Sequence, residues 1–127
     1  MPKSTYLSNS VLNAALRNVP YTSPATVYVA LFTVAPNAGG GGTEVSGGSY
    51  ARQPVTMTAP VSGQTSNAAD VVFPTASADW GTVVAYAYFD ALSSGNMLYF
   101  GNLGASRLVL ANDQVKFPAS QLVTSES

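Results

Sequence analysis

Short segments of β-branched and aromatic residues follow one another along most of this chain, separated by Gly, Pro, Ser and Asn. Such segments have the composition of β-strands, and the residues between them are those that turns favour. The pattern predicts a mainly β fold, an antiparallel, jelly-roll-like β-sandwich of about seven or eight short strands with one preceding helix. The expected strands are residues 26–33, 49–57, 69–73, 82–90, 97–103, 107–110, 114–117 and 121–124.

Individual residues refine where some strands lie in the sheets. Residues 26–33 are apolar on both faces, which predicts a central strand. Pro54 has no N–H to donate, so its strand is expected at a sheet edge or at a bulge. Asn112 and Asp113 predict a hairpin turn between the two short strands that flank them.

The aromatic residues near the strongest strand allow two interpretations each. Alternation along residues 82–90 places Val84, Tyr86 and Tyr88 on one face, where tyrosines serve either a core or an interface. We favour the core. Trp80, the only tryptophan, either closes one end of the sandwich with its N–H bonded to a carbonyl, or forms an exposed platform for a sugar ring. We favour the first of these for Trp80 also.

Residues 4–19 have the pattern of one amphipathic helix. Ser4 or Thr5 can cap its start through a side-chain oxygen, and Pro20 ends it. The helix either packs against its own domain, which we favour, or docks against a neighbouring molecule. The apolar residues recur at spacings of three to five positions and comprise Leu7, Val11, Leu12, Ala15, Leu16 and Val19.

A length of 127 residues predicts a single domain, in which residues 26–124 form the sandwich. Residues 35–48 form one long irregular stretch that contains six glycines. Long connections without regular structure are usually functional or disordered. The sequence therefore leaves two alternatives, a mobile loop that becomes ordered on assembly and a plainly disordered loop.

The lack of His and Cys excludes several kinds of chemistry. The chain has no disulfide framework, no thiol nucleophile, no catalytic imidazole and no thiolate or imidazole metal site. The six acidic residues are scattered along the sequence, so no carboxylate pair or calcium loop is evident. We expect no enzymatic activity, no cofactor and no bound metal ion.

The low charge points toward protein partners rather than nucleic acid or membranes. Five scattered cations cannot neutralise a phosphate backbone, and the longest apolar run, residues 83–89, is too short to span a bilayer. No secretory signal is visible at the start. Charged residues make up only 9% of the chain, which leaves two alternatives, a neutral but soluble β-domain or a domain whose surface is partly covered by a partner or by copies of itself. In the second case we expect a homo-oligomer.

Several segments, in this order and spacing, resemble a family of small virion proteins of tailed bacteriophages and prophages. These are TVYVALFT (residues 26–33), GTEVSGGSYARQ (42–53), FPTA (73–76), DWGTV (79–83), YFDA (88–91) and GNML (95–98). Members are variously described as tail-fibre-like, minor structural or head-decoration proteins, and the resemblance covers residues 6–124. The family contributes no catalytic residues.

The resemblance implies a non-enzymatic accessory subunit on the particle surface, made in the bacterial cytoplasm and located in the virion. The compact size favours a capsid-decorating or cement role, with other virion proteins as partners. The alternative is a tail, neck or fibre subunit, with a host-surface carbohydrate as an additional ligand. The residues expected at interfaces are Leu12, Leu16, Glu44, Tyr50, Arg52 and Trp80.

Overall fold

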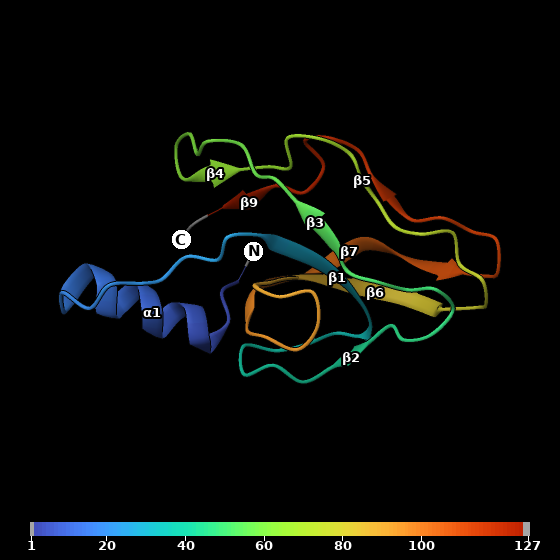
Figure 1. The fold of residues 1–127 in the computed structure, drawn as a ribbon, viewed down its shortest axis with the longest axis horizontal. Helices are drawn as coiled ribbons and strands as arrows, with labels where there is room; N and C mark the ends of the chain where they lie inside the picture. Colours follow the sequence, from blue (N-terminus) through green and yellow to red (C-terminus); the bar gives the residue numbers. More distant parts are fainter. Residues whose placement is uncertain (1, 126–127) are drawn as a thin grey trace.

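The computed structural model describes residues 2–125 of the chain. One helix, α1 (Thr5–Leu16), comes first and strands make up the rest of the regular structure (Figure 1). The strands are β1 (Val27–Val34), β2 (Thr43–Glu44), β3 (Gln53–Val55), β4 (Gln64–Thr65), β5 (Val71–Val72), β6 (Gly81–Phe89), β7 (Met97–Val109), β8 (Lys116–Phe117) and β9 (Thr124–Ser125). The predicted mainly β, antiparallel fold with one N-terminal helix is confirmed.

The main sheet has the strand order β2-β1-β6-β7, with β3 also paired to β1. All of its pairings are antiparallel. Strand β1 therefore lies between β6 on one side and β2 and β3 on the other, which confirms its predicted central place. Strand β3 contains Pro54 and pairs with β1 alone, so it occupies an edge as expected.

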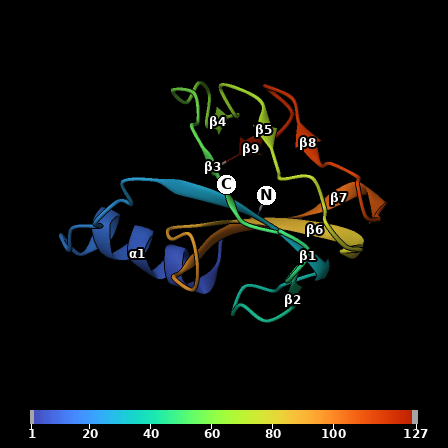
Figure 2. The ribbon, with the colours of Figure 1, turned by 45° about the vertical axis from the view of Figure 1, so that its right-hand side comes forward.

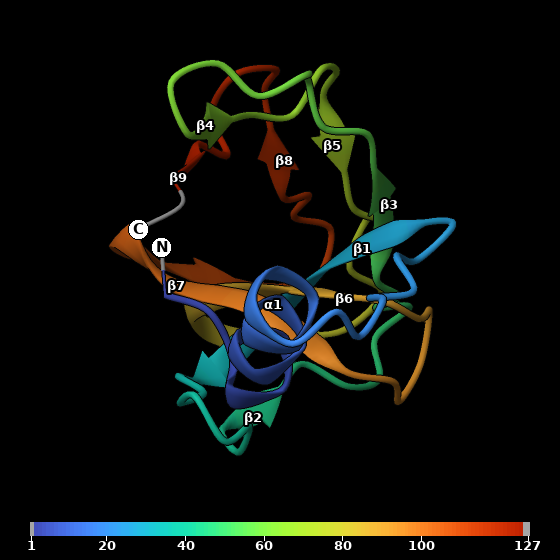
Figure 3. The same cartoon turned by 90° about the vertical axis from the view of Figure 1, so that its left-hand side faces the viewer.

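Two short antiparallel ribbons, β4–β9 and β5–β8, form a second layer over one face of the main sheet (Figures 2 and 3). Strand β2 lies on the other side of the sheet in Figure 3, where α1 is seen end-on and overlaps the strands. The larger hydrophobic core includes Leu31, Phe73, Val83 and Val109, all nearly free of solvent contact. This core joins side chains of the main sheet to side chains of the ribbon layer.

The opposite face of the main sheet is built from small residues and phenylalanines. Ala30, Ala85 and Ala87 are fully buried there, beside Phe32 and Met97. Alternation along β1 explains this, because neighbouring strand residues point to opposite faces.

An irregularity in the pairing of β6 and β7 corrects one predicted face. Val84 packs with the alanine face, whereas Tyr86 packs with the larger core, so the two do not share a face. The register breaks between Val83 and Ala85, where residues 103–106 of β7 lie opposite Val84 alone. The extra residues interrupt the alternation that the sequence suggested. Tyr88 is buried, as we expected.

Strand β7 differs from the prediction in its length, and β8 differs in its pairing partner. Strand β7 runs continuously from Met97 to Val109, where two strands, residues 97–103 and 107–110, were expected. The turn at Asn112 is present, with a positive φ of 74° and a hydrogen bond from the Leu110 N–H to Asp113 Oδ2. The predicted hairpin is nevertheless wrong, because β8 pairs with β5 in the second layer and not with β7.

Helix α1 is shorter than the predicted 4–19. Ser4 caps it by accepting a hydrogen bond from the Leu7 N–H at 3.1 Å. The helix ends at Leu16 because Asn18 adopts a left-handed conformation with φ of 56°, ahead of Pro20. In Figure 1 the helix extends past the end of the sheet, at the left of the view. Leu7 is its only buried residue.

The glycine-containing stretch of residues 35–48 holds more regular structure than expected. Strand β2 lies within it and pairs with β1. Asn37 and Gly40 form an isolated β-bridge, and the Thr5 N–H donates to Ala38 O at 2.7 Å. These contacts hold the stretch against β1 and the start of α1. Within residues 2–125 no helix is long and apolar enough to cross a membrane.

Candidate functional site

Three of the predicted interface residues meet at one place in the fold. Glu44 lies on β2, whereas Tyr50 and Arg52 lie on the connection that leads into β3. The Arg52 Nε donates to Glu44 Oε2 at 2.9 Å, and Nη2 donates to Oε1 at 2.8 Å. The Tyr50 hydroxyl donates to the same Oε2 at 2.7 Å. We refer to Glu44, Tyr50 and Arg52 as the Glu44 cluster.

Arg52 connects the Glu44 cluster to the β6–β7 loop, residues 90–96. Its Nη1 donates to Ala91 O at 2.9 Å and to Ser94 O at 2.8 Å. The guanidinium lies 3.8 Å from the centre of the Phe89 ring, a cation–π contact. The side chain is only 7% exposed, and four N–H bonds compensate the loss of hydration. Arg52 thus joins three separate chain segments.

Tyr50 extends the same cluster into the hydrophobic core. Its hydroxyl accepts the Leu31 N–H at 3.0 Å, and its ring contacts Trp80 edge-on with centroids 5.4 Å apart. Burial raises the pKa of Tyr50 far above its usual range, and the hydrogen bond to Glu44 raises it further. The hydroxyl therefore stays protonated and acts as a structural donor at neutral pH.

Trp80 lies in the core and not on the surface. Its side chain is 6% exposed, and Nε1 donates to Gly48 O at 2.8 Å. This is the arrangement that we favoured from the sequence, with the indole N–H bonded to a carbonyl. Trp80 is not an exposed platform for a sugar ring, because its faces are covered by the chain itself.

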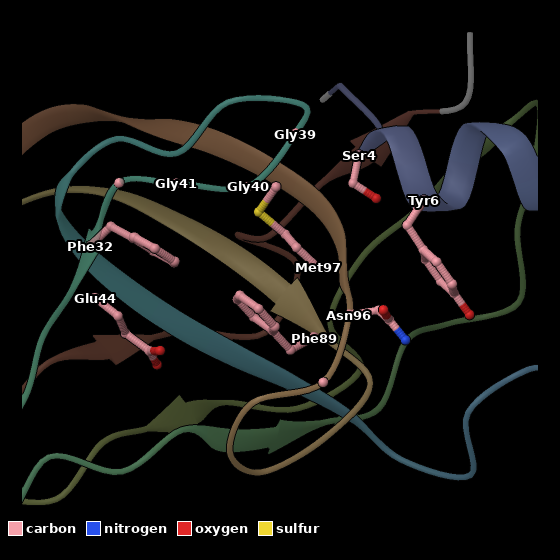
Figure 4. Close-up of a pocket in the computed structure, with 12 residues that line it drawn as sticks. Ser4, Tyr6, Phe32, Gly39, Gly40, Gly41, Glu44, Phe89, Asn96 and Met97 are labelled. Carbon is pink, nitrogen blue, oxygen red and sulfur yellow. The ribbon is translucent and has the colours of Figure 1, made fainter.

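A pocket of about 400 Å³ opens beside the Glu44 cluster, on the alanine face of the sheet (Figure 4). The side chains of Phe32, Phe89 and Met97 line it from three neighbouring strands. The glycines of residues 39–42 border it on another side, and Tyr6 projects near Asn96 (Figure 4). Glu44 also lines this pocket, with its carboxylate already bonded to Arg52 and Tyr50. The pocket therefore suits an uncharged group with both apolar and polar surface.

The remaining predicted interface residues lie on α1, away from the Glu44 cluster. Leu12 is 54% exposed and Leu16 is 76% exposed. The structure thus separates the six residues into two surface leucines and four residues that hold the fold together, Trp80 among the latter. The interpretation of α1 as a helix packed on its own domain holds only for its first turn, where Leu7 is buried.

Asn67 is a structurally central residue that the sequence did not single out. It is completely buried, and its Nδ2 donates to Ala69 O and Pro118 O, both at 2.9 Å. Its Oδ1 accepts the Leu122 N–H at 2.9 Å. An asparagine among polar residues usually indicates a turn. The sequence contains no signal that this one lies inside the fold.

The described residues provide little for metal or acid–base chemistry. Among residues 2–125, no group of three or more Asp, Glu, His or Cys side chains lies close enough to hold a metal ion.

Asp70 and Lys116 form an exposed ion pair at 3.2 Å. The Ala119 N–H and this lysine hold the pKa of the Asp70 carboxyl below its usual range. The ion pair lies across the β5–β8 ribbon, and the Ala119 N–H bond joins the residue before β5 to the segment after β8.

Comparison with known proteins gives one family. A family model described as "Podophage GP4 fiber I protein gp80" matches residues 2–125 of the chain. A search of curated proteins finds no match. The matched range is the same as the range of residues that the structure describes, so it takes in α1, the main sheet and the ribbon layer alike.

Proposed function

Because this chain belongs to the podophage GP4 fiber I protein gp80 family, and so to the structural components of phage virions, we propose that it is a non-enzymatic subunit of the virion's tail-fibre apparatus. The observation that carries the proposal is the family match over residues 2–125. The printed description of that family names a fibre protein. This favours a fibre location over the capsid-decorating role that the compact size of the chain had suggested.

The arrangement of the polar side chains supports a structural role. The ionisable groups of the Glu44 cluster bond to one another and to backbone carbonyls, which stabilises the fold and leaves no group poised to react. In the described part of the chain, every buried side-chain nitrogen and oxygen has a hydrogen-bond partner. A subunit of an extracellular particle needs such stability more than it needs reactive groups.

The number of copies per particle tests the fibre location. Quantitative mass spectrometry of purified virions would compare this chain with the major capsid protein. A small fraction of the capsid copy number, together with antibody labelling at the tail in electron micrographs, is expected. A copy number close to that of the capsid protein, with label over the shell, would instead establish capsid decoration.

Recognition of a host-surface carbohydrate is a second candidate function, and the pocket in Figure 4 favours it. Tyr6 offers an exposed aromatic ring next to this pocket, and Asn96 offers an amide. Sugar rings bind through stacking on aromatic faces and through hydrogen bonds from their hydroxyls.

Purified surface polysaccharide from host cells provides the test of this second function. Titration into the labelled protein should shift the NMR signals of Asn96 and residues 39–42. The shifts should be lost in Tyr6→Ala and kept in Leu108→Ala, which alters an exposed apolar residue elsewhere. Unchanged spectra of the wild-type protein would eliminate the pocket as a carbohydrate site.

A further inference from the structure

The carboxylate of Asp90 fixes the orientation of the Asn96 amide, which lines the pocket in Figure 4. The Asn96 Nδ2 donates to Asp90 Oδ2 at 3.0 Å, and the Asn96 backbone N–H donates to Asp90 Oδ1 at 2.7 Å. An ionised carboxylate only accepts hydrogen bonds, so the Nδ2 of Asn96 must face Asp90. The Oδ1 of Asn96 therefore lies on the side of the amide away from Asp90.

The amide oxygen is thus the polar atom that Asn96 directs toward the pocket. In Figure 4 this oxygen lies on the side of Met97, which lines the pocket, and the nitrogen lies on the opposite side. An amide oxygen accepts hydrogen bonds from O–H and N–H groups and donates none. A ligand in the pocket must therefore present a donor to Asn96.

The loop that carries Asp90 and Asn96 is tightly closed. Gly95 has a φ of 74°, and a Cβ added to it would lie 2.5 Å from Asp90 Oδ1 and 2.7 Å from the Ala91 Cβ. The Asp90 N–H donates to Asn96 O at 3.2 Å, and Arg52 binds the Ala91 carbonyl of the same loop. The Asn96 amide is therefore held in one orientation before a ligand arrives, which lowers the cost of binding.

The charge of the pocket disfavours acidic ligands. Among the described residues that line it there is no Lys or Arg, and Glu44 is the one charged side chain. A carboxylate on a ligand would lose hydration on entry. The Glu44 carboxylate and the Asn96 oxygen could not compensate this loss, because neither donates a hydrogen bond. A sugar that carries hydroxyl donors and no carboxylate avoids this cost.

We propose that Asp90 is a positioning residue that makes the pocket selective for neutral over acidic saccharides, because it holds the Asn96 oxygen toward the ligand. The proposal rests on the carbohydrate-binding function proposed for this pocket and adds to it the class of sugar. Asp90→Asn separates this role from closure of the loop. The substituted amide keeps an oxygen for the Asn96 backbone N–H and places an NH₂ group against the Asn96 side chain. The Asn96 amide must then turn over, which directs its own NH₂ group toward the pocket.

Nuclear Overhauser effects of the Asn96 side-chain NH₂ protons test this orientation without a ligand. We expect them to reach the Asp90 Hβ protons in the wild-type protein and the Met97 methyl group in Asp90→Asn. Asp79→Asn is the matched control and should keep the wild-type pattern, because Asp79 also accepts a backbone N–H, from Ala111 at 2.9 Å, but does not line the pocket. An identical pattern in the wild-type protein and Asp90→Asn would overturn the proposal.

Binding of one polysaccharide in two charge states tests the selectivity. Purified host surface polysaccharide is prepared with its carboxylates reduced to alcohols, and separately with its primary alcohols oxidised to carboxylates. The wild-type protein should bind the neutral sample about tenfold more tightly than the acidic one. Asp90→Asn should lose this preference, whereas Asp79→Asn, which removes the same charge, should keep it.

The two possible failures of this titration are distinguishable. Equal affinity of the wild-type protein for both samples, or a preference that Asp90→Asn retains in full, would overturn the proposal and leave the carbohydrate function of the pocket standing. If neither sample binds the wild-type protein, the carbohydrate function itself is removed and the selectivity with it.

Discussion

The Glu44 carboxylate and the Arg52 guanidinium form a two-point ion pair, with N–H···O contacts of 2.9 and 2.8 Å. The pair lies where β2, the connection to β3 and the β6–β7 loop meet. Arg52 is buried, so the pair is shielded from water and from salt. Through this pair, the Glu44 cluster provides the main polar contacts that hold this edge of the sheet.

Removal of Arg52 should therefore be strongly destabilising. Arg52→Met leaves the Glu44 carboxylate without its cation and two backbone carbonyls without donors. We expect a loss of about 3–5 kcal/mol in the free energy of unfolding, measured by urea denaturation. Lys116→Met breaks the exposed pair with Asp70 and should move the urea midpoint very little. Equal effects of the two substitutions would show that the Glu44–Arg52 pair contributes no more than a surface pair.

Gly48 should be intolerant of a side chain because of its place beside Trp80. An added Cβ would lie 2.8 Å from Trp80 Nε1 and 3.0 Å from Ala78 O, in a backbone with φ of 57°. We expect Gly48→Ala to cost about 2–4 kcal/mol, from backbone strain and displacement of the indole together. The Trp80 emission should shift to longer wavelength as the ring becomes hydrated.

Gly47 provides the matched control for that substitution. Its φ is also positive, at 75°, but no atom lies within 4 Å of its added Cβ. Gly47→Ala should cost only the strain of the left-handed backbone, about 1 kcal/mol, and leave the Trp80 emission unchanged. A red shift in Gly47→Ala would contradict the contact that we assign to Gly48.

The buried tyrosines should make the protein less stable in alkali. Burial raises the pKa of Tyr88 to about 12, and burial with the Glu44 hydrogen bond raises that of Tyr50. An unfolded tyrosine loses its proton near pH 10. The folded state then holds more protons than the unfolded state, so the stabilisation is complete below pH 10 and is lost as the pH rises above it.

Urea midpoints at pH 8, 10 and 11 would measure this dependence. Above pH 10 the free energy of unfolding from these urea curves should decline less steeply in Tyr50→Phe, by up to about 1.4 kcal/mol per pH unit. Tyr6→Phe, which alters an exposed ring, should decline like the wild type. A Tyr50→Phe slope equal to that of the wild type would count against burial of the hydroxyl.

Asn67 should be required for the ribbon layer. Asn67→Ala leaves the Ala69 and Pro118 carbonyls and the buried Leu122 N–H without their side-chain partner. We expect a loss of about 2–4 kcal/mol in the free energy of unfolding. Amide exchange should quicken at Leu122, while the exposed Asn102→Ala variant keeps both properties of the wild type. Unchanged exchange at Leu122 would contradict the assigned bond.

Much of the local structure could be predicted from the sequence because it depends on neighbouring residues. The strands around Val29 and Ala87, the Ser4 cap and the turn at Asn112 follow from propensity, periodicity and capping. The buried indole of Trp80 was also foreseen, because a lone tryptophan between strands usually fills a core. The end of α1 was missed by three residues, since the left-handed Asn18 overrides an apolar pattern that continues to Val19.

The candidate site could be predicted from the sequence only in part. The sequence marks Leu12, Leu16 and Glu44 as candidate interface residues. Their spacing does not indicate that the two leucines lie on an exposed helix face or that Glu44 forms an ion pair with a buried arginine. Strands β2 and β4 were too short to show periodicity. The partner of β8 was assigned wrongly because Val72 lies more than 40 residues earlier in the chain.

By itself, then, the sequence determined the class of this protein: mainly β, without reactive thiols or imidazoles, poor in charge, and led by one apolar helix. Only the tertiary structure decided which residues meet. Arg52 reaches Ser94, 42 positions away, and Asn67 reaches Leu122, 55 positions away. The physical reason is that strand order and buried polar contacts depend on chain closure over long separations, whereas propensity and periodicity act over one strand or one helical turn.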